Sequence, residues 1–171
     1  MIYEKKSAYL HDTILKLETN IDDCTGEMLG YVMELLLQAG AKDVHYTPVY
    51  MKKNRPAWQL NVLCDQKQAE ELEAIIFHET TTIGIRHQIM ERTILPREQV
   101  TVQTEFGTAE VKVCVIGEEI RCYPEYDSVK AVCEKTGVSY QEVYQKVMQA
   151  GKDVMKQRGG AEYHGILEKN V

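Results

Sequence analysis

Three short polar segments hold the side chains best suited to chemistry. Segment 18–23 ends in paired carboxylates, segment 51–56 carries two lysines and an arginine, and segment 79–86 carries a glutamate, three threonines and an arginine. The residues concerned are Asp22, Asp23, Lys52, Lys53, Arg55, Glu79, Thr80, Thr81, Thr82 and Arg86. Carboxylates are hard oxygen ligands for Mg²⁺ or Mn²⁺, and lysine and arginine bind phosphate oxygens. Brought together, these groups would suit a metal-bound nucleotide.

Alternating and helical patterns predict the elements that carry these segments. Apolar and polar residues alternate over 13–21, which indicates a half-buried strand. Thr25 is a suitable cap for the helix that follows, and Gly40 suits its left-handed end. Strands are expected over 44–51 and 57–64, on either side of a tight turn at 54–56.

A second helix and a fourth strand complete this first region. Asp65 and Gln68 resemble a capping box for a helix that carries Leu72 and Ile76, and 83–95 is expected to be a strand ended by Pro96. The order strand, helix, strand, strand, helix, strand is that of ferredoxin-like split βαβ domains. We therefore predict an α+β fold, with a ferredoxin-like sandwich over residues 12–96.

Topology then places all three polar segments at one edge. With right-handed crossovers, the third strand lies antiparallel between the first and second, and the fourth lies beside the first. The end of the first strand, the hairpin between the second and third, and the link from the second helix to the fourth strand then share one edge of the sheet. The exposed face of that sheet is expected to be polar, with Glu18, Asn20, Gln59, Asn61 and Arg86.

A smaller α+β subdomain is predicted over 97–156. Strands are expected around 100–104, 109–115 and 120–123, followed by a helix to about Lys135 and a last helix with a capping box at Ser139 and Glu142. Residues 157–171 are polar and contain Gly159-Gly160, so this tail is predicted to be disordered.

Composition excludes several classes of protein. The formal net charge is -6, from 20 Lys and Arg against 26 Asp and Glu, with no basic stripe, so nucleic acid is not an expected partner. No apolar run reaches the roughly 20 residues of a membrane span, and the first ten residues lack a signal-peptide pattern, so a cytoplasmic protein with no membrane partner is predicted. The five cysteines have no CxxC spacing, which argues against a zinc or disulfide scaffold.

Each polar segment also has a simpler structural explanation. Asp22-Asp23 before a helix can be an N-terminal cap, Lys52-Lys53 can be a solvated turn, and the threonine run can reflect strand propensity. The polar sheet face can be solvated or can meet another subunit. Only the convergence of the three segments favours a binding site.

The chain resembles the LarC family of nickel insertases, specifically the carboxy-terminal region. The resemblance covers about residues 12–150 and is carried by four motifs, which are Leu17-Glu18-Thr19-Asn20-Ile21-Asp22-Asp23, Met51-Lys52-Lys53-Asn54-Arg55-Pro56, residues 77–86 (FHETTTIGIR) and Tyr123-Pro124-Glu125-Tyr126. It implies CTP-dependent insertion of nickel into a pyridinium bisthiocarboxylic acid mononucleotide, with Mn²⁺ or Mg²⁺ assisting hydrolysis of CTP to CMP and pyrophosphate. The expected partners are CTP, that mononucleotide, an amino-terminal LarC part and further copies of the chain in a trimer or hexamer.

The edge geometry suggests a role for each residue. Asp22, Asp23 and Glu79 are candidate metal ligands, and Lys52, Lys53, Arg55, Thr80, Thr81, Thr82 and Arg86 are candidate nucleotide ligands. Glu18 and Glu125 rank below these. The alternative is a non-catalytic module of the same assembly, which senses nucleotide or forms oligomers, since similar folds serve both purposes.

Overall fold

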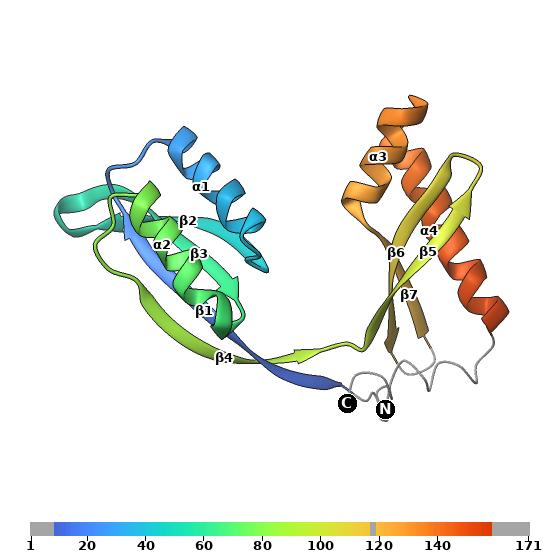
Figure 1. The fold of residues 1–171 in the computed structure, drawn as a ribbon, viewed down its shortest axis with the longest axis horizontal. Coiled ribbons are helices and arrows are strands. Elements are labelled where there is room, and N and C mark those ends of the chain that lie inside the picture. The colour runs from blue at the N-terminus through green and yellow to red at the C-terminus, as the bar shows by residue number, and fades with distance from the viewer. Residues whose placement is uncertain (1–8, 117–118, 159–171) are drawn as a thin grey trace. The chain divides into compact units, whose positions relative to one another are not determined.

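The computed structural model describes residues 9–116 and 119–158. The chain forms two compact units, the first spanning His11–Arg92 and the second containing the described residues from Thr93 onward (Figure 1). Each unit has its own hydrophobic core, which confirms the predicted α+β fold with a second, smaller subdomain. The domain boundaries 12–96 and 97–156 stay a prediction.

The first unit is a four-stranded antiparallel sheet covered by two helices. Its elements are β1 (Leu10–Ile21), α1 (Gly26–Gln38), β2 (Asp43–Met51), β3 (Arg55–Cys64), α2 (Ala69–Glu79) and β4 (Arg86–Ile94), with short 3₁₀ turns at Lys52–Asn54 and Gln66–Gln68. The strand order is β2-β3-β1-β4, and β3 runs antiparallel to both β1 and β2. This is the split βαβ arrangement that the element order predicts.

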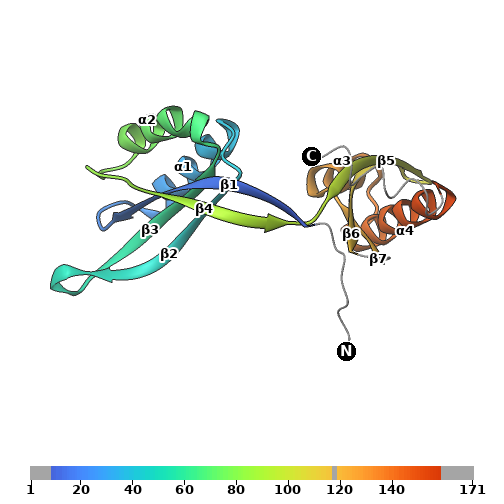
Figure 2. The ribbon, with the colours of Figure 1, turned by 90° about the horizontal axis from the view of Figure 1, so that it is seen from below.

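The core of the first unit lies between the sheet and its helices. Both helices lie on the same face of the sheet (Figure 2). Leu17 of β1, Leu36 of α1, Leu60 of β3 and Leu72 of α2 are each 0% exposed, so the sheet and both helices contribute to one cluster. Burial of such a side chain contributes about 1.5–3 kcal/mol. The other face of β1 carries the polar side chains that alternate with this core.

Local sequence explains where α1 begins and ends. The Thr25 hydroxyl accepts a hydrogen bond from the Met28 amide at 3.2 Å, as a helix N-cap does. After the helix, Gly40 has a φ of 93°, a left-handed conformation that glycine adopts without strain. Both predictions for this helix are confirmed.

Three local predictions in the first unit are wrong. Asp65 makes no side-chain capping bond, because its carboxylate pairs with Lys42 Nζ at 2.5 Å. The fourth strand begins at Arg86 rather than at residue 83, since hydroxyl contacts hold the preceding threonine segment as a loop. The hairpin turn is at Lys52–Asn54 rather than at 54–56, and both Lys53 and Asn54 have positive φ.

The second unit is a three-stranded antiparallel sheet with two helices. Its elements are β5 (Arg97–Thr104), β6 (Gly107–Ile116), β7 (Glu119–Pro124), α3 (Tyr126–Thr136) and α4 (Tyr140–Arg158). The strand order is β5-β6-β7. Gly151 of α4 is buried against the sheet, where an added Cβ would lie 3.0 Å from Val111 Cγ1. The helix can therefore approach β6 closely.

The carboxy-terminal end departs in part from the prediction. The Ser139 hydroxyl accepts from the Glu142 amide at 3.3 Å, as expected of a cap. Gln157 and Arg158 belong to α4, so the predicted disordered tail begins too early at 157, and its remainder, 159–171, lies outside the described residues. Among the described helices, none has the length and apolar character needed to cross a membrane.

Candidate functional site

The three polar segments meet at the end of β1. Arg55 Nη1 donates to Asp22 Oδ2 at 2.9 Å, which joins the hairpin to the first segment. The Thr81 hydroxyl donates to Asp23 Oδ1, which joins the third segment to the neighbouring carboxylate of the first. The separate loops therefore form one edge, as the topology predicts.

Cationic neighbours keep Asp22 ionised. The hydrogen bond from Arg55 is the main cause that holds the pKa of Asp22 below its ordinary value, and the charge of Lys52 acts in the same direction. The Asp22 side chain is 23% exposed and the Arg55 side chain 53% exposed, so an incoming ligand can reach both. Lys53 lies at the exposed tip of the hairpin.

The threonine segment uses its three hydroxyl groups in different ways. Thr80 closes the end of α2 by donating to the Ile76 carbonyl at 2.7 Å. Thr82 contacts the Thr19 hydroxyl at 2.5 Å and the Gly84 carbonyl at 3.2 Å. Thr81 alone among the three reaches a carboxylate of the edge, and its hydroxyl also lies 3.8 Å from Cys24 Sγ. Thr81 is thus the hydroxyl best placed for a ligand.

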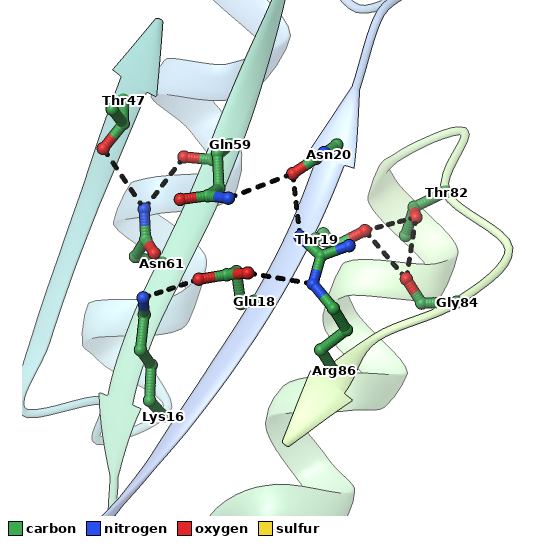
Figure 3. Close-up of polar contacts among 10 residues, drawn as sticks. All are labelled: Lys16, Glu18, Thr19, Asn20, Thr47, Gln59, Asn61, Thr82, Gly84 and Arg86. Carbon is green, nitrogen blue, oxygen red and sulfur yellow. Dashed lines mark hydrogen bonds and ion pairs between the residues drawn. The ribbon is translucent and has the colours of Figure 1, made fainter. Parts of the chain in front are cut away.

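Arg86 is held within a polar network on the open face of the sheet (Figure 3). Its Nε donates to Glu18 Oε1 at 2.8 Å, and its Nη2 donates to Asn20 Oδ1 at 2.8 Å. Glu18 also accepts from Lys16 Nζ at 2.6 Å. The guanidinium therefore pairs with a carboxylate that it shares with Lys16.

This network makes a pH-dependent contribution to stability. The hydrogen bond from Lys16 and the bond from Arg86 hold the pKa of Glu18 below its ordinary value of 4.5. Because the folded-state pKa is the lower one, the stabilisation is present above the unfolded-state pKa and is lost as pH falls through the folded value. We expect Glu18→Gln to lower the free energy of unfolding at pH 7 by less than about 1 kcal/mol. In urea titrations the difference from wild type should disappear as pH falls through the folded-state pKa of Glu18, and a difference that persists at still lower pH would contradict this assignment.

Asp22 and Asp23 can serve a cation only if the ligand supplies further oxygens. Among the described residues, no group of three or more His, Cys, Asp or Glu side chains is arranged to hold a metal ion. Magnesium in nucleotide sites often takes only one or two carboxylates, with phosphate and water oxygens completing the shell. Two adjacent carboxylates meet that requirement. Glu79 is the last residue of α2, and Glu125 lies in the second unit, where it pairs with Lys112 at 2.7 Å.

A cavity beside Asp22 is a feature that the residue patterns do not reveal. Its volume is about 330 Å³, and its lining includes Asp22, Cys24, Pro48, Tyr50 and Trp58. Trp58 is 40% exposed and Tyr50 75% exposed, so aromatic surface is available next to the carboxylate. Trp58 is the single tryptophan of the chain. Its place on β3 next to the hairpin is readable from the sequence as aromatic surface near the edge, but the cavity itself is not.

Comparison with known proteins gives a consistent result. A family model described as nickel insertion protein matches residues 1–144. The pyridinium-3,5-bisthiocarboxylic acid mononucleotide nickel insertion protein of Alkaliphilus metalliredigens is 48% identical over 153 residues, which cover 85% of this chain and 36% of the relative. Its counterpart from Acetivibrio thermocellus is 46% identical, again over 85% of this chain and 36% of the relative. The chain therefore spans about a third of the length of these relatives.

A solved structure has a similar fold. It is the apo form of the C-terminal domain of a cyclometallase involved in the synthesis of the NPN cofactor of lactate racemase. The TM-score is 0.73 at 42% sequence identity, and the match covers 84% of this chain and 99% of that domain. The similarity thus extends over nearly the whole of a separately solved domain.

Proposed function

Because this chain belongs to the nickel insertion protein family, we propose that it takes part in nickel insertion into the pyridinium-3,5-bisthiocarboxylic acid mononucleotide by binding metal-bound CTP. The chain spans 36% of the length of its relatives, so the complete reaction is proposed for an assembly that includes an amino-terminal part. The observation that carries the proposal is the edge where Arg55 lies 2.9 Å from Asp22 and Thr81 bonds Asp23.

The charges of the edge suit a triphosphate and its cation. Asp22 and Asp23 would hold Mg²⁺ or Mn²⁺, with Glu79 as a further candidate, and a cation there would neutralise charge on the phosphates. Arg55 now pairs with Asp22, and it would turn to a phosphate oxygen once the carboxylate has another partner. Lys52 and Lys53 at the hairpin would bind the terminal phosphates and stabilise the charge of a leaving pyrophosphate.

We further propose that the cavity beside Asp22 holds the nucleobase. Its aromatic and proline walls suit a planar ring, and bases stack well on exposed aromatic side chains. Trp58 and Tyr50 provide such surface. Thr81, within the edge, would contact a phosphate or ribose oxygen. The hydroxyls of Thr80 and Thr82 bond within the loop, and Arg86 bonds Glu18. These residues would hold the loop and the sheet face next to the ligand in place.

Binding can be measured directly with the single tryptophan. We expect CTP with Mn²⁺ to change the fluorescence of Trp58 in a saturable way and to release heat in calorimetry. ATP, GTP and UTP serve as the comparison set, because they share the triphosphate and differ in the base. Binding of none of the four with Mn²⁺ present would refute the proposal, and equal binding of all four would refute the base pocket alone.

A non-catalytic role is the second candidate, and the open sheet face supports it. Asn61 on this face is only 1% exposed, and its Oδ1 has no hydrogen-bond partner among the described residues. Buried acceptors are normally satisfied. Another copy of the chain against this face, in a trimer or hexamer, would contact the exposed Arg86 side chain, and Asn61 Oδ1 would gain a partner only if the side chains around it rearranged.

Two readouts separate the candidates. The chain would be incubated with CTP and Mn²⁺, pyrophosphate would be measured, and the mass of the particle would be followed by light scattering. Pyrophosphate release supports the enzyme. A stable oligomer with neither pyrophosphate release nor a response to nucleotide supports the oligomerisation module, and CTP binding without hydrolysis supports the sensing role.

A further inference from the structure

A buried hydroxyl in the middle of β1 contacts the threonine loop. Thr19 is 2% exposed, and it lies between Leu17 and Ile21, both members of the core cluster. A polar group in such a place costs free energy unless it is hydrogen-bonded. Valine has the same shape as threonine and no hydroxyl, so it would fill this buried position without that cost.

The hydroxyl is satisfied entirely by the loop that links α2 to β4. Thr19 Oγ1 donates to the Gly84 carbonyl at 2.8 Å and lies 2.5 Å from Thr82 Oγ1 (Figure 3). The Gly84 carbonyl lies within reach of both hydroxyls, and either hydroxyl can donate in the contact between Thr19 and Thr82. Both partners are more than 60 residues away in sequence, at separations of 63 and 65.

These two contacts define the position of the loop at its far end. At its near end the loop is fixed by Thr80, which donates to the Ile76 carbonyl at 2.7 Å and accepts from the Thr82 amide at 3.3 Å. Thr81 lies between the two anchors and reaches Asp23. The orientation of the Thr81 hydroxyl toward the edge therefore depends on Thr19.

We propose that Thr19 is a positioning residue, which holds loop 80–85 so that Thr81 faces the carboxylates of the edge. Thr19 does not touch the ligand itself. The link to nucleotide binding rests on the proposed function above, whereas the link to loop order does not.

The test uses Thr19→Val and Thr19→Ser in the full chain. Thr19→Val removes the hydroxyl and keeps the buried shape, which leaves the Gly84 carbonyl with Thr82 alone, at 3.2 Å. Thr19→Ser keeps the hydroxyl and removes a buried methyl group, which lowers stability. The positioning role predicts that Thr19→Val binds CTP less well than Thr19→Ser, although Thr19→Ser loses buried packing.

Amide hydrogen exchange, measured without ligand, reports directly how well loop 80–85 is held in place. Exchange over residues 80–85 should rise about fivefold in Thr19→Val, the size of effect that one lost neutral hydrogen bond gives, and should match wild type in Thr19→Ser. Affinity for CTP with Mn²⁺ should fall by a similar factor in Thr19→Val and stay within about twofold of wild type in Thr19→Ser.

Each outcome decides one claim. Wild-type exchange in Thr19→Val, or equal loss of affinity in both variants, would overturn the positioning role. If wild-type protein does not bind CTP, the proposed function fails, and the exchange data still decide whether Thr19 positions the loop.

Discussion

Replacing Asp22 and Asp23 together by asparagine should lower Mn²⁺-dependent affinity for CTP at least about 100-fold, or about 2.7 kcal/mol. Both side chains keep their shape and lose the negative charge that a divalent cation needs. Without the cation, the change should have the opposite sign. The phosphates would then meet two fewer negative charges near Arg55 and Lys52, so weak metal-free binding should be unchanged or stronger.

A matched control removes the effect of net charge. Asp43 and Asp65 lie at the end of β2 and β3 far from the hairpin, where they pair with His45 and Lys42. Replacing both by asparagine alters net charge by the same amount and should leave CTP affinity within about twofold. Calorimetry with and without Mn²⁺ measures both effects. Metal-dependent binding that survives the change of Asp22 and Asp23 would contradict the metal assignment.

The second large effect concerns the core of the first unit. Leu36→Ala should lower the free energy of unfolding by about 3–5 kcal/mol, from lost burial and the cavity that remains. Leu36 is 0% exposed and packs in the cluster between α1, α2 and the sheet. Small domains are stable by only about 5–15 kcal/mol, so this loss is a large share of the total. Urea unfolding followed by circular dichroism measures it.

The next residue of the same helix provides the control. Leu37 is 47% exposed, so Leu37→Ala makes the same chemical change and should cost less than about 1 kcal/mol. Comparable losses in the two variants would mean that α1 does not pack on the sheet by the face described.

Much of the first unit could be predicted because its periodic patterns are strong. The alternation along β1 indicates which residues enter the core, and the split βαβ order fixes the strand arrangement β2-β3-β1-β4. Given that arrangement, the meeting of Asp22 with Arg55 follows from topology. The Thr25 cap and the left-handed Gly40 follow from local backbone chemistry.

The features that could not be predicted are contacts between residues that are distant in sequence. Asp65 has the local signature of a helix cap, but its Oδ1 forms an ion pair with Lys42 Nζ at 2.5 Å instead. Thr19 has the pattern of an ordinary β-branched core residue, because its partners Thr82 and Gly84 lie more than 60 positions away. The three threonines look equivalent in sequence, and only the fold distinguishes Thr80 and Thr82, which bond within their own loop, from Thr81, which reaches Asp23. The cavity at Trp58 likewise requires three-dimensional structure.

The most direct test of the proposed binding edge is the map of amide chemical shifts on addition of CTP with Mg²⁺. We expect the largest changes in residues 22–25, 52–55 and 79–84, three separate stretches that should respond together over the same range of ligand concentration. Saturable binding with those stretches unchanged, and with the changes confined to residues 97–158, would contradict the proposal.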